Sequence, residues 1–190
     1  MSTSAEDLRA IALAEFATAG YAATSLHRIA DLAGLSKSSV LYHYASKETL
    51  LEATVAPALR RIEGILDALQ ASALTPAGRA AFLSEFVDFV LQYRREVNIF
   101  INQGPSLVDV PVIDEANGIV HRLADFFAAN TASVEEKMRF GIALGGAAYM
   151  LCSPESVALE ADQVDEVRAA LLNILTELLA PVAASVAIGD

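Results

Sequence analysis

Residues 24–48, TSLHRIADLAGLSKSSVLYHYASKE, contain two short helical segments joined by a turn. Apolar residues recur at helical spacing over 26–33 and again over 37–44, and a turn that begins at Gly34 separates the two segments. Glycine tolerates the positive φ that such a turn needs, and Ser36 can cap the second helix. The pattern predicts a helix-turn-helix whose second helix carries short polar and basic groups on its outer face.

The rest of the chain also has helical spacing. It contains no long run of strict polar and apolar alternation, and no Asn-Gly or Asp-Gly turn lies between β-branched segments. Because Pro57 lies well inside one of the expected helices, we expect a kink or a break there. Besides the two short helices, the helices expected are 5–19, 47–70, 76–96, 97–103, 112–129, 133–152 and 162–180.

The N-terminal stretch from Leu8 to Val55 resembles the DNA-binding domain of tetracycline-repressor-like (TetR) transcriptional regulators. One departure matters, because Leu41 stands where many members have tyrosine, with Tyr42 beside it. One step along a helix turns a side chain by about 100°, so Tyr42 cannot be assumed to replace that tyrosine. The resemblance rests on an ordered, gapless set: Phe16, Gly20, Tyr21, Thr24, Ser25, Ile29, Ala30, Ala33, Gly34, Leu35, Ser36, Lys37, His43, Ser46, Lys47 and Glu48.

The resemblance implies which residues contact DNA. Thr24 and Lys47 match phosphate contacts, and a helix N-terminus beside Lys47 would strengthen the second of these. Tyr42 and His43 lie near the end of the recognition helix, where such regulators commonly touch backbone phosphates. The full implied set is Thr24, Ser36, Lys37, Ser38, Ser39, Tyr42, His43 and Lys47.

The same resemblance implies the architecture. The expected fold class is all-α with about nine helices, in which a three-helix DNA-binding domain over 1–46 precedes a helical ligand-binding and dimerisation domain over 47–190. The expected function is a DNA-binding regulator, a repressor that binds a palindromic operator as a homodimer and is released by a small, mostly apolar effector. The alternative is a helical small-molecule binding or interaction module that does not bind an operator.

The charge of the chain needs to be reconciled with DNA binding. The net charge is −11, and phosphate affinity comes from lysine and arginine. Counted by position, residues 1–50 carry −1 and residues 51–190 carry −10, whereas 24–47 carries +2. The acidity therefore belongs to the part that does not have to touch DNA. We expect weak non-specific binding with a shallow dependence on salt, because few phosphates are neutralised per subunit.

Aromatic and amide residues in the middle of the chain are candidates for an effector site, since the family encloses an inducer among its middle helices. The aromatic residues at helical spacing over 82–93 equally fit a plain hydrophobic core. The mixture would suit a mostly apolar ligand held by a few amides. The candidates are Phe86, Phe89, Tyr93, Asn98, Asn102, Gln103, Phe126, Phe127 and Tyr149.

The last two expected helices are candidates for a dimer interface. The first has glycine and alanine at positions that allow close helix approach, and the second has a stripe of leucines. Two such helices fit an isologous four-helix interface, although they could instead complete a monomeric core. The candidate interface residues are Gly141, Gly145, Ala148, Leu171, Leu175 and Leu178.

No sequence feature points to catalysis or to a cofactor. The three histidines are far apart, and there is no HExxH, CxxC, G-x-S-x-G or glycine-rich phosphate loop. We therefore expect no catalytic residues, no metal and no cofactor. The longest uncharged run, Phe140 to Pro154, is shorter than a membrane-spanning helix, and one cysteine fits a reducing compartment. The expected location is the cytoplasm.

Overall fold

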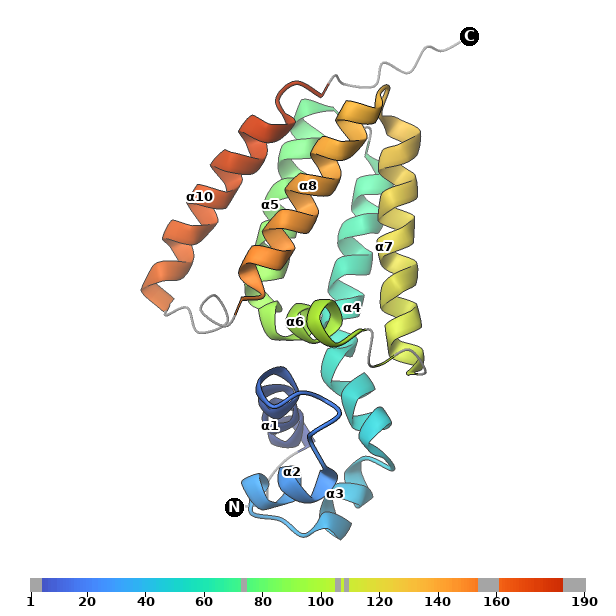
Figure 1. Cartoon of the computed structure of the whole chain (residues 1–190), viewed down its shortest axis with the longest axis vertical. Coiled ribbons are helices and arrows are strands. Elements are labelled where there is room, and N and C mark those ends of the chain that lie inside the picture. Colours follow the sequence, from blue (N-terminus) through green and yellow to red (C-terminus); the bar gives the residue numbers. More distant parts are fainter. Residues whose placement is uncertain (1–4, 73–74, 105–106, 108–109, 154–160, 183–190) are drawn as a thin grey trace. The chain divides into compact units, whose positions relative to one another are not determined.

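The computed structural model describes residues 5–72, 75–104, 107, 110–153 and 161–182, and each regular element within these ranges is an α-helix (Figure 1). The all-α class is therefore confirmed. The described helices, in chain order, are α1 (Ala5–Thr18), α2 (Leu26–Ala33), α3 (Lys37–His43), α4 (Lys47–Ala71), α5 (Pro76–Gln92), α6 (Arg94–Gln103), α7 (Pro111–Asn130), α8 (Val134–Leu151) and α10 (Ala161–Leu179).

Helix starts follow local capping signals. Side-chain oxygens of Ser25, Ser46, Thr75 and Ser133 each accept a hydrogen bond from the backbone N–H three residues on, at 3.0–3.1 Å. Each of these bonds satisfies a donor that the first turn of a helix leaves unpaired. The starts of α2, α4, α5 and α8 are therefore encoded by single residues next to them.

Of the kink or break expected at Pro57, the break does not occur, because α4 continues through Pro57 as one helix from Lys47 to Ala71, and the kink stays a prediction. Proline removes one backbone donor from a helix interior, which costs stability but does not by itself end the helix. Leu50, Leu51 and Leu59 on either side of Pro57 are buried. Packing of this face holds the helix together across the proline.

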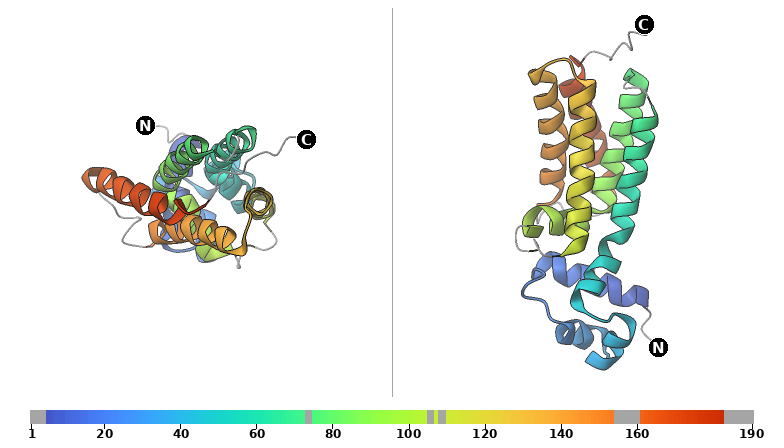
Figure 2. Two further views of the ribbon diagram at one scale, coloured as in Figure 1. Left: turned by 90° about the horizontal axis from the view of Figure 1, so that it is seen from above. Right: turned by 90° about the vertical axis from the view of Figure 1, so that its right-hand side faces the viewer.

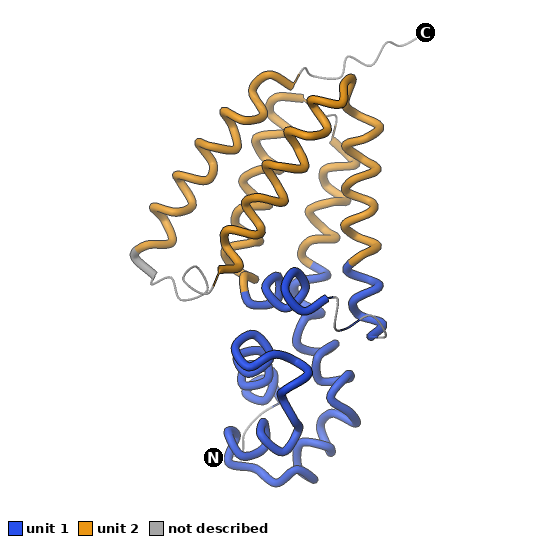
Figure 3. The backbone as a smooth tube through the Cα atoms, viewed as in Figure 1, with its two compact units in different colours: residues 1–60, 95–116 blue, residues 61–94, 117–190 orange. Residues whose placement is uncertain are grey.

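Contacts divide the chain into two compact units, residues 1–60 with 95–116 and residues 61–94 with 117–190 (Figure 3). The helix-turn-helix lies wholly in the first unit, together with α6 from Arg95 onward. Contacts define a compact unit, whereas activity defines a functional domain, so the two need not coincide. The division into domains at residues 46 and 47 therefore stays a prediction.

The first unit has an apolar centre formed by its N-terminal helices. α1 contacts α2, and α2 contacts α3. Phe16 of α1, Ile29 of α2 and Val40 of α3 have no exposed surface. These side chains lie at the helical spacing that the sequence shows, so the helices of the DNA-binding stretch form around one core.

The second unit is built on three helices that contact one another, α5, α8 and α10, which lie side by side (Figure 2). Aromatic rings fill much of its interior. The rings of Phe127 and Phe140 stack with their centroids 3.9 Å apart, and Phe82 meets Phe127 edge-on at 5.7 Å. The buried Cys152 is part of this unit, and burial raises the pKa of its thiol to about 11.

Arginine side chains tie α10 to the rest of the second unit. Arg168 donates to both carboxylate oxygens of Asp88 and, at 2.8 Å, to the hydroxyl of Ser84. Arg139 donates to the carbonyl of Leu178 at 3.0 Å, and Arg79 donates to that of Val182 at 2.7 Å. The bond to Leu178 satisfies one of the carbonyls that the C-terminal end of α10 leaves unpaired, and the bond to Val182 holds the residues that follow the helix.

The pair between Asp88 and Arg168 gives the stability a defined dependence on pH. The hydrogen bond from Arg168 holds the pKa of the Asp88 carboxyl below its ordinary value. A lowered folded-state pKa stabilises the protein above the unfolded-state pKa, and this contribution is lost as the pH falls through the folded value. Asp88→Asn should therefore lower the free energy of unfolding at pH 7, modestly because the pair is partly exposed.

Urea denaturation of wild type and Asp88→Asn at a series of pH values checks this expectation. The difference between the two proteins should shrink as the pH falls below the ordinary aspartate range. A difference that stays constant down to pH 2 would contradict the role given to this carboxylate.

Candidate nucleic-acid interface

The turn between α2 and α3 has the geometry that the sequence predicts. Gly34 adopts φ 66° and ψ 29°, a left-handed conformation that suits glycine. Leu35 N–H donates to the carbonyl of Ala30 at 2.9 Å, and this bond closes the C-terminal end of α2. The helix-turn-helix is therefore fixed by backbone hydrogen bonds within a few residues of the turn.

Three serines form a hydrogen-bonded group at the start of α3. Ser36 caps the helix by accepting from Ser39 N–H at 3.1 Å. The same Ser36 oxygen lies 2.9 Å from the hydroxyl of Ser38 and 2.8 Å from that of Ser39. The hydroxyl groups at the start of the recognition helix are therefore already engaged with one another.

The solvent-facing side of α3 consists of three rows of side chains. Residues four apart lie above one another on a helix, and successive rows are about 100° apart. Val40, followed by the cap residue Tyr44, faces the core and is buried. The remaining positions form what we call the outward rows of α3: Lys37 with Leu41, Ser38 with Tyr42, and Ser39 with His43.

Tyr42 lies at the centre of this surface. Its row is nearly opposite the buried side of α3, and the side chain is 88% exposed. Its ring meets the ring of His43 edge-on, with centroids 5.5 Å apart. Tyr42 is the second last residue of α3, near the end of the helix as expected, and a contact with backbone phosphates stays a prediction.

Thr24 and Lys47 point into the protein. Thr24 is 2% exposed, and its hydroxyl donates to the carbonyl of Gly20 at 2.8 Å. The Lys47 ammonium donates to the carbonyls of Tyr21 and Thr24 at 2.9 and 3.0 Å. Both predicted phosphate contacts stay predictions, and the geometry gives both side chains intramolecular partners instead.

Tyr21 completes this arrangement. Lys47 lies over the Tyr21 ring, 4.1 Å from its centroid, as in a cation–π contact. The Tyr21 hydroxyl donates to Glu48 at 3.2 Å. Burial, with the Glu48 carboxylate as a further cause, raises the pKa of Tyr21 to about 12. The phenol therefore stays protonated and binds the start of α4 to the segment that precedes α2.

Gln103, at the end of α6, also contacts this segment. Its amide nitrogen donates to the carbonyl of Phe16 at 2.7 Å, and its amide oxygen accepts from Tyr21 N–H at 2.6 Å. These two backbone groups flank Gly20, which has φ 91°. The sequence suggested Gln103 only as a ligand contact, and its actual partners are more than 80 residues away along the chain.

The basic groups near α2 are partly paired with acids. Arg28 donates to Glu15 at 3.2 Å, and His27 lies 2.9 Å from Asp31. Lys37 and His43 are exposed on the outward rows of α3. Few cations therefore face solvent around the recognition helix, in agreement with the small net charge of 24–47.

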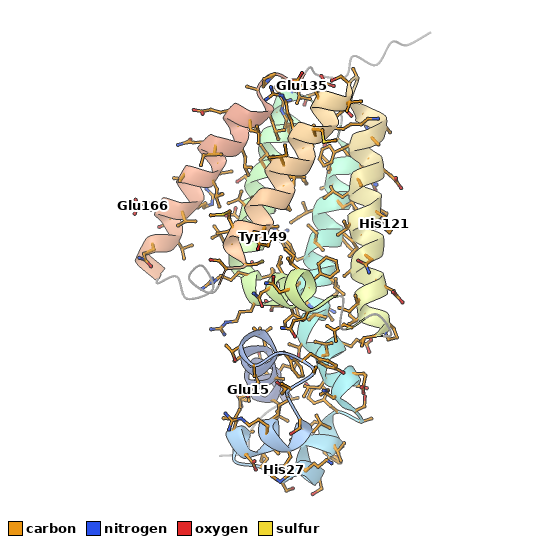
Figure 4. The ribbon with its side chains drawn as sticks, viewed as in Figure 1. Glu15, His27, His121, Glu135, Tyr149 and Glu166 are labelled. Carbon is orange, nitrogen blue, oxygen red and sulfur yellow. The ribbon has the colours of Figure 1, made fainter. Side chains whose placement is uncertain are left out.

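The predicted ligand residues are divided between the two compact units. Phe86, Phe89 and Phe127 are buried in the second unit, where Phe126 is half-buried and Tyr93 packs on Phe89. Tyr149 is an exposed residue of α8 (Figure 4). Asn98, Asn102 and Gln103 belong to the first unit, where Asn102 is exposed. A shared ligand site stays a prediction.

The candidate dimer residues lie on α8 and α10. Gly141 and Gly145 are exposed and Ala148 is half-buried. On α10, Leu175 is buried in the core of its unit, whereas Leu171 and Leu178 are half-buried. Within the described residues, no group of three or more His, Cys, Asp or Glu side chains could hold a metal ion.

Comparison with known proteins agrees with this geometry. The model of the family described as "Bacterial regulatory proteins, tetR family" matches residues 8–54. The comparison with curated proteins gives no match. No helix in the described part of the chain is long and apolar enough to cross a membrane.

Solved structures of regulators share the fold over nearly the whole chain. A TetR-family regulator from Streptomyces coelicolor matches with TM-score 0.69 and 24% identity, over 92% of this chain and 91% of that one. The ketosteroid transcriptional regulator KstR2 of Mycobacterium tuberculosis matches with TM-score 0.66 and 17% identity, over 96% of this chain and 97% of that one. A transcriptional regulator from Aquifex aeolicus matches with TM-score 0.65 and 19% identity, over 92% of this chain and 98% of that one.

The family match is confined to the N-terminal stretch 8–54, which has the sequence of the DNA-binding domain of bacterial TetR-family regulatory proteins. The solved structures show that the fold of such regulators extends over nearly the whole chain. The matched domain supports DNA binding by the N-terminal part of the chain.

The inward position of Lys47 predicts a loss of stability when its charge is removed. Lys47→Met keeps most of the stem but removes the ammonium from the carbonyls of Tyr21 and Thr24, of which the Tyr21 carbonyl keeps a bond from Thr24 N–H at 3.2 Å. It should lower the free energy of unfolding by about 1–2 kcal/mol. Lys37→Met, at an exposed position, is the matched control and should change it by less than about 0.5 kcal/mol. Urea denaturation measures both. Equal, small changes would mean that the Lys47 ammonium is not held inside.

Proposed function

We propose that this protein is a homodimeric repressor that binds a palindromic operator and is released by a small effector. The observation that carries the proposal is the outward surface of α3, which has the size and polarity of a recognition helix. A two-fold dimer would present two copies of α3 to successive major grooves. In this proposal residues 1–46 bind DNA, residues 47–190 bind the effector and the partner subunit, and the protein acts in the cytoplasm, where its operator lies.

Binding to DNA would rest on few charges. Of the basic residues in 24–47, Lys47 is held internally and Arg28 is paired with Glu15. Lys37, with His43 when it is protonated, would supply most of the contacts of each subunit to phosphates. Because affinity that comes from released counterions scales with the number of phosphates contacted, specificity would have to come mainly from base contacts.

An exposed apolar stripe on α8 supports the dimer. Val134, Met138, Ile142 and Tyr149 are large exposed hydrophobic residues. With Gly141 and Gly145 they fall within about 100° of one another around the helix. Contiguous exposed apolar surface marks an interaction site, and glycine in its centre allows two helices to approach closely. In an isologous dimer, this stripe would pack against the same stripe of the partner subunit.

The effector is proposed to be small and mostly apolar, because the interior of the second unit is rich in phenylalanine. Release would follow if the effector favours a conformation in which the two copies of α3 no longer match the operator spacing. The contact of Gln103 with the Phe16 and Tyr21 backbone would carry a displacement of α6 to the segment before α2.

Selection of binding sequences from a random duplex pool with the full-length protein tests the proposal. A palindromic sequence should emerge and should bind at least a thousandfold more tightly than bulk DNA at the same salt concentration. Repetition in the presence of cell extract should release the selected duplex. If no duplex outcompetes bulk DNA, the regulator proposal fails and the protein is a helical binding module without an operator.

The proposed interface predicts the effect of a charge on the α8 stripe. Ile142→Glu places a carboxylate at a position that is 63% exposed in the single chain and would be buried in the dimer. Because burial of an unpaired charge is costly, the variant should be monomeric by light scattering at a concentration where wild type is dimeric. Met150→Glu, on the same helix at 64% exposure but outside the stripe, should remain dimeric.

Two results would contradict this interface. A wild-type protein that is monomeric under these conditions would remove the dimer from the proposal. Dissociation by Met150→Glu with no effect of Ile142→Glu would place the interface elsewhere.

A further inference from the structure

In the proposed function, the outward surface of α3 faces DNA, and Leu41 is an apolar side chain on that surface. The inference below rests on the proposed function. It lies in the outward row of α3 that begins with Lys37, and it remains 39% exposed. Val40, its neighbour, is buried and already supplies the core contact of this turn. Leu41 therefore leaves more than a third of its surface available to a ligand.

The other side chains of α3 offer few ways to tell bases apart. Between Lys37 and His43 there is no Arg, Asn, Gln, Asp or Glu. These are the residues that pair with guanine, adenine or cytosine by strong hydrogen bonds in the major groove. The hydroxyls of Ser38 and Ser39 are already bonded to Ser36. The serine hydroxyls keep only part of their hydrogen-bonding capacity for a base, and Lys37, Tyr42 and His43 are the other polar side chains of this helix.

Thymine presents a methyl group in the major groove, and among the four bases this group suits an apolar side chain. We propose that Leu41 contacts the C5 methyl of a thymine in each half-site of the operator. Leu41 thereby determines specificity at that position by apolar contact.

The base that Lys37 contacts should lie close to this thymine, because Lys37 and Leu41 belong to the same row of α3. Lysine in the major groove favours guanine, through the O6 and N7 acceptors. Four residues span about 6 Å along a helix, and base pairs are about 3.4 Å apart. The half-site read by this row therefore contains a guanine within about two base pairs of the thymine that Leu41 contacts.

Replacement of thymine by deoxyuridine tests the contact, because it removes the methyl and leaves the hydrogen-bonding groups of the base unchanged. The selected duplex is made with deoxyuridine at one thymine of each half-site in turn, and dissociation constants are measured with the full-length protein. At one position, loss of the methyl should weaken wild-type binding about fourfold per half-site, as expected for burial of one methyl group.

Two leucine variants assign the effect to a side chain. Leu41→Ala should bind the thymine and deoxyuridine duplexes equally at that position. Leu32→Ala is the matched control, because Leu32 is an exposed leucine of α2 with a similar exposed fraction, 44%, outside α3. It should keep the full sensitivity of wild type. An unchanged helical circular dichroism spectrum and an unchanged urea midpoint show that the variant is folded.

The outcomes separate this inference from the proposed function. If wild type binds a selected duplex but no deoxyuridine substitution weakens it, the inference is wrong and the regulator function stands. The inference is equally wrong if Leu41→Ala keeps the sensitivity of wild type, since the methyl is then read by another residue. If no duplex is selected at all, both fail together.

Discussion

The left-handed backbone at Gly34 is the constraint on which the DNA-reading surface depends. Its φ of 66° lets the chain reverse within three residues, so that α2 ends and α3 begins around one core. No atom lies near the place where a Cβ would be, so the requirement for glycine comes from the backbone conformation and not from crowding. Once Val40 and Tyr44 are buried, the direction of the remaining α3 side chains is determined.

Two polar side chains hold the segment before α2 to helices that are distant in sequence. Lys47 and Gln103 both bond backbone atoms of residues 16–24, one from α4 and the other from α6. These bonds join backbone groups of the last turn of α1 and of the segment before α2 to helices that come later in the chain. A lysine that resembles a phosphate contact thus stabilises the DNA-binding unit, and the charge left for DNA is correspondingly small.

Local signals account for what the sequence predicts well. The caps at Ser25, Ser36, Ser46, Thr75 and Ser133 act within three residues, so the helix starts can be predicted without knowledge of the fold. The continuity of α4 through Pro57 depends on the burial of side chains around it, which only the tertiary structure supplies.

Predictions about the candidate site are likewise limited by contacts that only the tertiary structure supplies. Residues of the recognition helix can be identified from spacing because the helix-turn-helix is compact in sequence. The inward direction of Thr24 and Lys47 depends on partners up to 26 residues away, and the contacts of Gln103 span 82 and 87 residues. Tyr149 belongs to a stripe that could be assigned to the outer surface only when the buried side of α8 was known.

The central claim is that the outward rows of α3 read bases, with Tyr42 at their centre. The most direct measurement is the affinity of Tyr42→Ala for the selected operator and for a random duplex of equal length at one salt concentration. A base contact predicts a loss of about tenfold or more on the operator and little change on the random duplex. Equal losses on both duplexes would mean that Tyr42 contacts phosphates, and no loss on either would mean that α3 does not read DNA through this surface.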